Sequence, residues 1–297
     1  MVFNHLIGVR FPVGPPNNSM KLLRIGKPNQ EKPAFIDANG IIRDLSSVIQ
    51  DLNQVTINQK TIEIIDNINP KKLPEISNKT RIGACVSNPQ KFIGIGLNYI
   101  DHAKETGMKI PSEPIVFLKA NSCISGPYDS VLIPKKSKKT DWEIELGIVI
   151  GKKAQYIPQN ESINHIFGYC IVNDISEREF QFERLGQWDK GKGCDTFGPI
   201  GPFLVTKDEI KDVQNLNLEL KVNGKIMQKG NTKKMIFGVS YIVSYLSNFM
   251  TLNPGDIITT GTPPGVGMAK NPSVFLKRGD EMMLKIDNLG FQKQKVI

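Results

Sequence analysis

The stretch that decides the fold is Thr140-Asp141-Trp142-Glu143-Ile144-Glu145-Leu146-Gly147-Ile148-Val149-Ile150-Gly151. Branched and apolar residues dominate it and a glycine closes it, a pattern that predicts a β-strand. Because side chains alternate between the faces of a strand, Asp141, Glu143 and Glu145 are expected on one face. Neighbouring carboxylates on that face would lie about 7 Å apart, at roughly 3.3 Å of rise per residue. The apolar flank from Leu146 to Ile150 predicts that the strand lies deep in a core.

Carboxylates this close together in a partly desolvated place repel each other unless a positive charge lies between them. A divalent cation that prefers oxygen ligands is the economical source of that charge. The alternative is a solvated strand face paired with lysines, and four of them lie just upstream: Lys135, Lys136, Lys138 and Lys139. The residues alone leave a metal site and an ion-paired surface both open.

Composition indicates a globular protein, favours the cytoplasm, and argues against membrane and nucleic-acid partners. The chain has 297 residues, 39% of them hydrophobic and 23% charged, which fits about two domains. No apolar run approaches the ~18 residues of a membrane span, so no membrane partner is expected. The four cysteines lack metal-binding or disulfide spacing, which predicts a reducing cytoplasm. The net charge of +9 comes from dispersed lysines. A general lysine bias or a small anionic substrate explains it, and no nucleic-acid-binding motif accompanies it.

The chain divides into three parts. Residues 1–19 are expected to be a flexible arm, with Met20 as a plausible alternative start. Residues 20–90 are expected to form a small N-terminal domain and linker, with a hairpin turning at Asn39-Gly40 and short helices at 46–52 and 61–68. Residues 91–297 show short strands, a clear hairpin at Asn223-Gly224 and one helix near 239–250, which predicts a mostly antiparallel β domain. The expected fold class is α+β, mainly β.

A third acid and a histidine pair extend the carboxylate strand into a candidate site. Asp174 ends a buried-type strand and is expected beside Glu143 and Glu145, which gives an oxygen-only set. Such a set selects Mg²⁺ first, then Mn²⁺ or Ca²⁺. His102 and Glu105 are spaced i, i+3 and could form a general base that activates water. The alternative for this pair is a surface turn with an incidental ion pair.

Three glycine-bearing segments are further candidates. Lys192 lies between glycines and could stabilise an enolate or oxyanion, or it could be a solvated loop lysine. The turn Thr260-Gly261-Thr262-Pro263 could bind a carboxylate or could be a plain Gly/Pro turn. Gly94 and Gly96 resemble part of a dinucleotide loop, but Tyr99 stands where the third glycine would be and no long βαβ pattern follows. A dinucleotide site is therefore rejected.

Taken in chain order, these motifs resemble those of the fumarylacetoacetate hydrolase family over about Phe92 to Ile297. The residues that carry the resemblance are Gly96-Leu97-Asn98-Tyr99, His102 with Glu105, Glu143-x-Glu145, Asp174 with Arg178, Lys192, and Thr260-Gly261-Thr262-Pro263. The resemblance implies a mainly β, roll-like catalytic domain that is usually a homodimer.

The resemblance also implies roles for these residues. Glu143, Glu145 and Asp174 would bind Mg²⁺ or Mn²⁺, and the metal would chelate the carboxylate and keto oxygen of a 2-oxo acid. His102 and Glu105 would lie on a lid segment as the catalytic pair, assisted by Lys192. The remaining residues expected to bind substrate are Asn98, Tyr99, Lys119, Arg178 and Thr262. For Arg178 a structural salt bridge competes with substrate contact, and for Gln228 a hairpin hydrogen bond does. Asp141 is expected to orient a neighbour or cap the strand.

Within the family, one group of hydrolases is the most similar. Residues 177–181, 186–192 and 195–199, with 20–26 at the start, resemble the hydrolases of 2,4-diketo-3-deoxy sugar acids. Members of that group cleave 2,4-diketo-3-deoxy-L-fuconate or -rhamnonate to pyruvate and lactate. The expected activity is hydrolysis of a C–C bond in a 2,4-diketo acid, within carbohydrate catabolism. Ureidoglycolate lyase, oxaloacetate decarboxylase and acylpyruvase stay open as alternatives, and so does a basic ligand-binding protein without activity.

Overall fold

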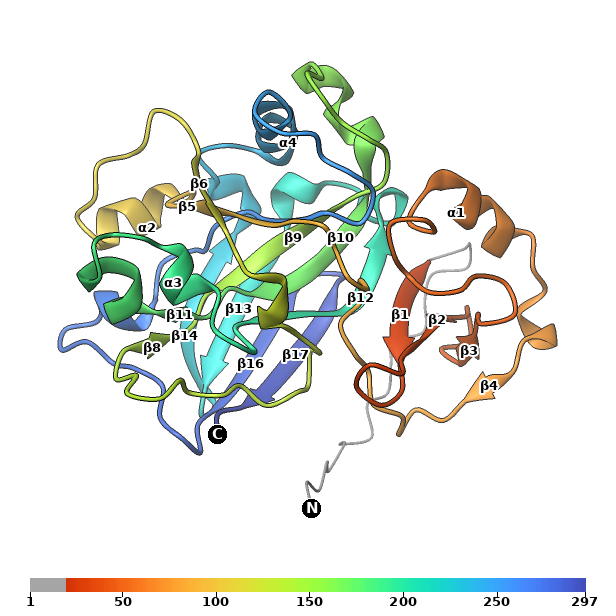
Figure 1. Ribbon diagram of the computed structural model, residues 1–297, viewed down its shortest axis with the longest axis horizontal. Helices are drawn as coiled ribbons and strands as arrows, with labels where there is room; N and C mark the ends of the chain where they lie inside the picture. The colour runs from red at the N-terminus through yellow and green to blue at the C-terminus, as the bar shows by residue number, and fades with distance from the viewer. Residues whose placement is uncertain (1–19) are drawn as a thin grey trace.

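A sheet of eleven strands organises the chain (Figure 1). The structure, a computed structural model, describes residues 20–297, so the arm expected at 1–19 lies outside the described residues. Ten strands follow one another in the order β4-β3-β2-β1-β12-β10-β9-β15-β5-β6, and β7 pairs with β12. Their bounds are β1 Lys21–Ile25, β2 Lys32–Ile36, β3 Ile42–Asp44, β4 Glu75–Ile76, β5 Phe92–Gly96, β6 Ile115–Leu118, β7 Ile124–Ser125, β9 Ile144–Ile150, β10 Ile166–Asn173, β12 Gly198–Thr206 and β15 Ile257–Thr259.

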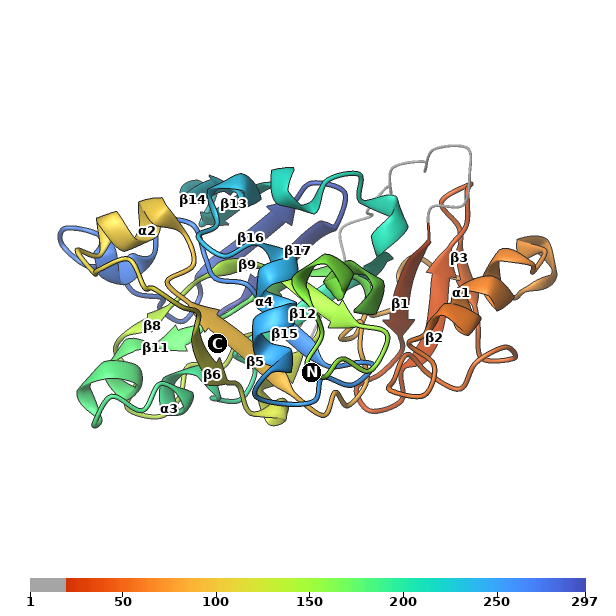
Figure 2. The same ribbon diagram turned by 90° about the horizontal axis from the view of Figure 1, so that it is seen from above.

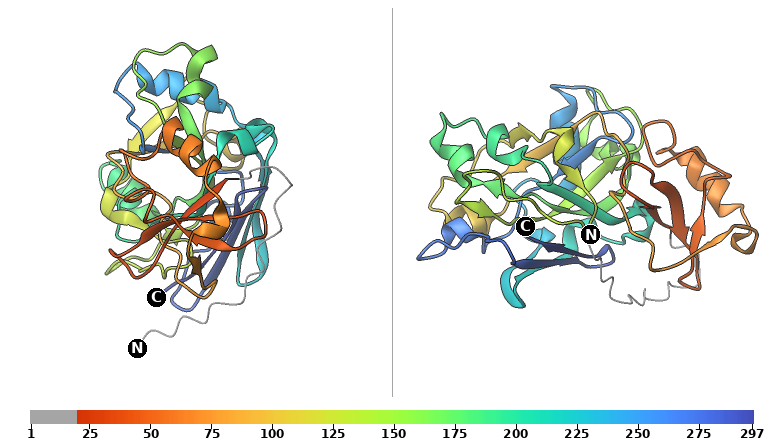
Figure 3. Two further views of the ribbon diagram at one scale, coloured as in Figure 1. Left: turned by 90° about the vertical axis from the view of Figure 1, so that its right-hand side faces the viewer. Right: turned by 60° about the horizontal axis from the view of Figure 1, so that its bottom comes forward.

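Two smaller sheets and four α-helices complete the fold. A four-stranded sheet in the order β14-β13-β16-β17 packs against β9, β10 and β12, and Figure 3 shows β16 and β17 along one side of the molecule. The bounds of the smaller sheets are β8 Thr140–Asp141, β11 Ser176–Glu177, β13 Asn217–Val222, β14 Lys225–Asn231, β16 Glu281–Ile286 and β17 Gly290–Lys295. The helices are α1 Gln59–Asp66, α2 Ile100–Glu105, α3 Asp189–Lys192 and α4 Val239–Ser247, with a π-helix at Glu179–Glu183. The predicted class, α+β and mainly β, is confirmed.

The N-terminal segment extends the large sheet at one end of the molecule (Figure 2). The hairpin predicted around Asn39-Gly40 is present as β2 and β3, and β1 joins this end to β12. The helix predicted at 46–52 is wrong. After the Ile49 amide donates to the Leu45 carbonyl, the carboxylate of Asp51 accepts the Leu52 amide and binds Arg24, so the backbone does not continue as a helix.

The strand predicted over 140–151 is interrupted. β8 ends at Asp141 and β9 begins at Ile144, so Trp142 and Glu143 lie between two strands. The Trp142 amide donates to the Asp141 carboxylate and the Glu143 amide to the Asn173 side chain, so neither takes a ladder partner. The flank of β9 is fully buried as expected. Within residues 20–297, no helix has the length and hydropathy needed to cross a membrane.

Candidate metal centre and active site

The carboxylates of Glu143, Glu145 and Asp174 gather where β9 begins and β10 ends. The two strands are antiparallel neighbours, with Val172 opposite Glu145. The Asp174 amide donates to the Glu143 carbonyl oxygen at 2.9 Å, which joins the two ends. One oxygen from each side chain lies within 4.8 Å of the others, and all three side chains are buried. We call these three residues the carboxylate trio.

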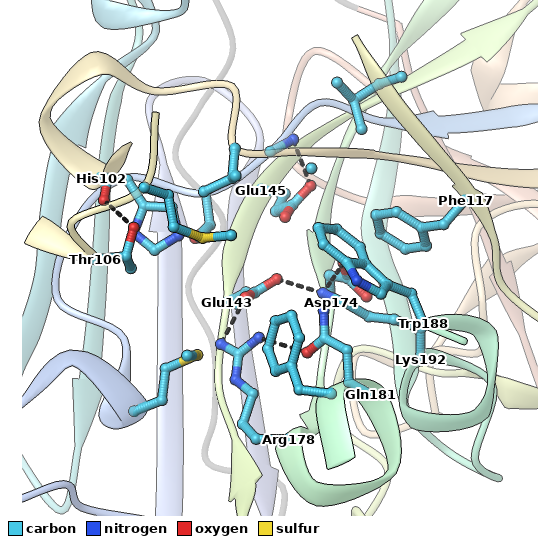
Figure 4. A pocket seen from close by; sticks show the side chains of 18 residues that line it. His102, Thr106, Phe117, Glu143, Glu145, Asp174, Arg178, Gln181, Trp188 and Lys192 are labelled. Atoms are coloured by element: carbon cyan, nitrogen blue, oxygen red, sulfur yellow. Dashed lines mark hydrogen bonds and ion pairs between the residues drawn. The ribbon is translucent and has the colours of Figure 1, made fainter. Parts of the chain in front are cut away.

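Buried cations face the trio (Figure 4). The Lys192 Nζ atom lies 2.6 Å from an oxygen of Glu143 and 2.6 Å from an oxygen of Asp174. The Lys119 Nζ atom lies 2.6 Å from the other Asp174 oxygen and also donates to the Lys192 carbonyl. The guanidinium of Arg178 lies 2.6 Å from the second Glu143 oxygen. The upstream lysine cluster of the alternative interpretation is therefore not what neutralises these acids.

Asp141 lies beside the trio and positions Arg178. Its carboxylate accepts hydrogen bonds from the amides of Gly267 at 2.7 Å and Met268 at 3.0 Å, and from Arg178 Nε at 2.9 Å. Because Asp141 holds Arg178 and Arg178 contacts Glu143, the three side chains form one buried chain of charge.

The pKa values of the two glutamates of the trio are shifted in opposite directions. Burial raises the pKa of both. For Glu143 the positive charges of Arg178 and Lys192 outweigh burial and hold the pKa well below its usual range. For Glu145 burial and the negative charges of Asp174 and Glu143 raise the pKa well above its usual range. Negative charge is therefore least compensated at Glu145, where an added cation would be stabilising.

A divalent cation fits this arrangement. Glu145 accepts hydrogen bonds from Thr259 Oγ1 at 2.5 Å and the Gly261 amide at 2.6 Å, both on Oε2. No side chain among residues 20–297 binds its other oxygen, Oε1. Three convergent carboxylates without nitrogen or sulfur ligands suit a hard ion such as Mg²⁺ or Mn²⁺.

His102 and Glu105 lie on the short helix α2, as the i, i+3 spacing predicts. Their Nδ1 and Oε2 atoms are 3.4 Å apart, and Glu105 also accepts the Gly265 amide at 2.9 Å. Burial raises the pKa of Glu105, but the hydrogen bonds from His102 and Gly265 outweigh it and lower the pKa. His102 lines the same cavity as the trio. The pair is therefore held across the cavity from the carboxylates by the loop that carries Gly265.

The residues expected to bind substrate fall into two sets. Arg178 and Thr262 line the cavity, whereas Asn98, Tyr99 and Lys119 do not. The Thr262 hydroxyl donates to the Ile144 carbonyl at 2.8 Å, so its proton is already used.

Asn98, Lys119 and Tyr99 do not line the cavity, and the first two bind other parts of the protein. The Asn98 side chain bonds the backbone of Phe237 and Thr260, and Lys119 pairs with Asp174 as described. Tyr99 is buried, and its hydroxyl has no hydrogen-bond partner among the described residues.

Sequence reasoning missed several residues that line the cavity, among them Phe117, Gln181, Phe182 and Trp188. Gln181 follows Arg178 by three positions, and its Oε1 accepts from Arg178 Nη1 at 3.0 Å. The i, i+3 spacing is a signal for this contact once the segment is helical. No local pattern marks Phe117 or Trp188, because both reach the cavity through long-range packing.

Comparison with known proteins identifies the family. The chain matches the family model described as "Fumarylacetoacetate (FAA) hydrolase C-terminal" over residues 91–297. The chain belongs to the fumarylacetoacetate hydrolase family. A Burkholderia ambifaria relative, named as a hydrolase without a stated substrate, is 56% identical over 276 residues that cover 93% of this chain and 98% of the relative.

Solved structures of this family share the whole fold. Fumarylacetoacetate hydrolase from psychrophilic Exiguobacterium antarcticum is 32% identical with a TM-score of 0.84, covering 94% of this chain and 99% of its own. A 2-hydroxyhepta-2,4-diene-1,7-dioate isomerase from Mycobacterium marinum is 30% identical with a TM-score of 0.72, covering 94% and 98%. The solved relatives are named as hydrolases and isomerases, and this chain shares their fold and has a carboxylate trio. The comparisons therefore support an enzyme.

Proposed function

We propose that this protein is a divalent-cation-dependent hydrolase that cleaves a C–C bond in a 2,4-diketo acid. The observation that carries the proposal is one cavity lined by both the carboxylate trio and His102, with Glu105 at the imidazole. A divalent cation is typical of this family, and Mg²⁺ or Mn²⁺ suits the trio.

The head of the substrate would be a 2-oxo acid. A cation bound by Glu143, Glu145 and Asp174 would supply Lewis-acid polarisation and a template for the carboxylate and 2-keto oxygens. The Lys192 ammonium would donate a hydrogen bond to the oxygen on which enolate charge develops. Burial of Lys192 excludes bulk water, which strengthens that interaction.

His102 would act as the general base. Its Nδ1 faces Glu105, so Nε2 is the nitrogen that takes a proton from water. The water oxygen bonds to C4, the C3–C4 bond breaks, and the electron pair passes to C3 as the enolate of pyruvate. A proton then returns to C3, and the other product is a carboxylic acid. The carboxylate of Glu105 would stabilise the imidazolium that forms between these steps.

The tail of the substrate rests on the sequence resemblance. It favours a 2,4-diketo-3-deoxy sugar acid, which would yield pyruvate and a 2-hydroxy acid. Acylpyruvase, oxaloacetate decarboxylase and ureidoglycolate lyase are the alternatives with the same trio. Isomerisation is a second candidate, because three solved relatives are named isomerases.

A substrate panel with Mg²⁺ or Mn²⁺ tests the proposal. We expect turnover of 2,4-diketo acids to pyruvate, loss of the rate on dialysis against EDTA, and recovery when Mg²⁺ is returned. Undiminished activity after EDTA would overturn the role of the cation. Full activity of His102→Ala would point instead to decarboxylation or isomerisation, which need no hydrolytic water.

The proposal extends to location and assembly. The four cysteines are free thiols, which agrees with a reducing cytoplasm. A homodimer is expected from the family resemblance, and light scattering of the purified protein would test it. No nucleic-acid partner is proposed.

A further inference from the structure

Two glycines of β5 make room for two aromatic rings beside the active site. A Cβ atom on Gly94 would lie 2.1 Å from the ring of Phe117, and a Cβ atom on Gly96 would lie 2.5 Å from the indole of Trp188. The two rings are neighbours, with centroids 5.7 Å apart. Gly94 and Gly96, which do not form a dinucleotide loop, therefore leave the space that these two aromatic side chains occupy.

A third ring completes this surface. Phe182 meets Trp188 edge to face, with centroids 5.7 Å apart and an interplanar angle of 79°. We call Phe117, Phe182 and Trp188 the aromatic wall, and all three line the same cavity as the carboxylate trio. Lys192 Nζ lies 5.0 Å from the centroid of the Phe117 ring, so the wall begins where the charged cluster ends (Figure 4).

In the described part of the chain, the cavity offers no unpaired lysine or arginine for a second anionic group, and its histidine, His102, is used by the proposed catalytic step. Among residues 20–297, the lysines and arginines that line it are Arg178 and Lys192. Both are paired with carboxylates at 2.6 Å. A substrate with a carboxylate at its far end would place that charge against the aromatic wall without a partner, which is costly in a partly desolvated cavity.

We infer that the part of the substrate beyond C4 is uncharged and ends in an apolar group, and that the aromatic wall determines this specificity. The inference rests on the proposed function, which places the 2-oxo acid head at the trio. It separates this protein from a relative whose name specifies a 1,7-dioate, a compound with a carboxylate at each end. The tail of 2,4-diketo-3-deoxy-L-fuconate, which leaves as lactate, ends in a methyl group and belongs to the favoured class.

Matched substrates test the inference directly. With Mg²⁺ present, we expect kcat/KM for 2,4-dioxoheptanoate to exceed that for 2,4-dioxoheptanedioate, the same chain with a terminal carboxylate, by at least about 100-fold. From acetylpyruvate to 2,4-dioxoheptanoate, each CH₂ that packs on the wall should raise kcat/KM about fourfold. Equal or better turnover of the dioate would overturn the inference.

Variants locate the preference in the wall. Trp188→Ala should flatten the dependence on chain length, and Gly96→Ala should act in the same direction by displacing the indole. Phe182→Lys supplies a cation and should raise kcat/KM for the dioate at least about tenfold relative to 2,4-dioxoheptanoate. Phe249→Ala, an exposed aromatic residue that does not line the cavity, is the control and should change neither ratio. Unchanged chain-length dependence in Trp188→Ala would sink the assignment to the wall.

A binding measurement keeps the two proposals apart. Calorimetry with Mn²⁺ present compares 2-oxohexanoate with 2-oxoadipate, which have the same length and cannot undergo the cleavage. Tighter binding of 2-oxohexanoate supports the inference, whether or not a diketo acid is turned over. Absence of turnover would overturn the proposed hydrolase and leave the inference intact. Tighter binding of 2-oxoadipate would overturn the inference with the hydrolase intact.

Discussion

The ammonium nitrogen of Lys192 lies 2.6 Å from a carboxylate oxygen of Glu143, and both side chains are almost wholly buried. The carboxylates around it raise the pKa of Lys192 although burial alone would lower it, so the lysine carries its charge. Lys192 thus bridges Glu143 and Asp174, and a bound cation would share these carboxylates with it.

Lys192→Met should therefore lower the stability of the metal-free protein and increase the stabilisation that Mg²⁺ provides. Breaking a buried ion pair leaves an uncompensated charge and costs about 3–5 kcal/mol of unfolding free energy. Thermal unfolding in EDTA should show a lower Tm than the native protein, and Mg²⁺ should raise the Tm by more than it does in the native protein. The rate should fall by about 10²–10³-fold, because a donor to the developing enolate is lost.

Lys190→Met is the matched control for that experiment. Lys190 is two residues away, exposed, and donates to the Arg184 carbonyl rather than to the trio. Its substitution should leave the Tm in EDTA and the response to Mg²⁺ unchanged. A Lys192→Met protein as stable in EDTA as the native one would show that the trio is neutralised in another way.

Glu145→Gln should weaken metal binding directly. The substitution keeps the shape of the side chain but replaces an ionisable ligand, so affinity for Mn²⁺ should fall at least about 100-fold by calorimetry. Thr259→Val removes the hydroxyl donor to Glu145 Oε2 and should cost about 10–100-fold by loosening that ligand. Glu281→Gln, an exposed acid on β16, should leave the affinity unchanged. Native Mn²⁺ affinity in Glu145→Gln would remove this residue from the ligand set.

The lowered pKa of Glu105 predicts that the free energy of unfolding decreases at acid pH. Its folded pKa is lower than its ordinary value, so the unfolded chain binds the proton first as pH falls. The stabilisation that Glu105 provides is therefore complete above its ordinary pKa of about 4.3 and disappears as pH falls through the lowered folded value. Urea unfolding between pH 7 and pH 3 should show a steeper acid loss in the native protein than in Glu105→Gln. Parallel pH profiles for the two proteins would contradict the hydrogen bonds assigned to this carboxylate.

The sequence predicted the parts of the site that depend on short-range geometry. Strand alternation indicates Glu145, a buried-strand terminus indicates Asp174, and i, i+3 spacing indicates the His102–Glu105 pair. The position of Asp174 beside Glu143 needs more than local spacing, because it depends on the register of β9 and β10. That register, with Val172 opposite Glu145 and Asn173 opposite Ile144, depends on the packing of two fully buried strands, which no local pattern specifies.

Other features depend on packing that spacing does not encode. At the break, the Trp142 and Glu143 amides donate to the side chains of Asp141 and Asn173, and Asp141 also accepts amides of Gly267 and Met268, more than 120 positions away. In the same way, Trp188 enters the cavity because Gly96 has no side chain to exclude it. A strand pattern cannot reveal either contact, because the two partners of each contact are distant in the sequence and neither segment carries a signal for the other.

Gln228 gives the last prediction, because it connects β14 to the start of β9. It is fully buried; its Oε1 accepts the Ile144 amide at 3.0 Å, and its Nε2 donates to Thr262 Oγ1 and the Pro263 carbonyl at 2.7 Å each. These bonds run to other elements and not within the hairpin, so Gln228 holds the backbone between Glu143 and Glu145. Gln228→Leu leaves buried groups unpaired and should cost about 2–4 kcal/mol of unfolding free energy, measured in urea.

A second buried glutamine separates this effect from general destabilisation. Gln292 donates to the carbonyls of Ile171, Pro199 and Gly201, away from the trio. Gln292→Leu should cost a similar free energy but leave Mn²⁺ affinity unchanged, because the ligand backbone keeps its contacts. In Gln228→Leu the affinity should fall about tenfold as Ile144 shifts between its two ligand neighbours. Equal Mn²⁺ affinity in the two variants would reduce Gln228 to a residue of the core.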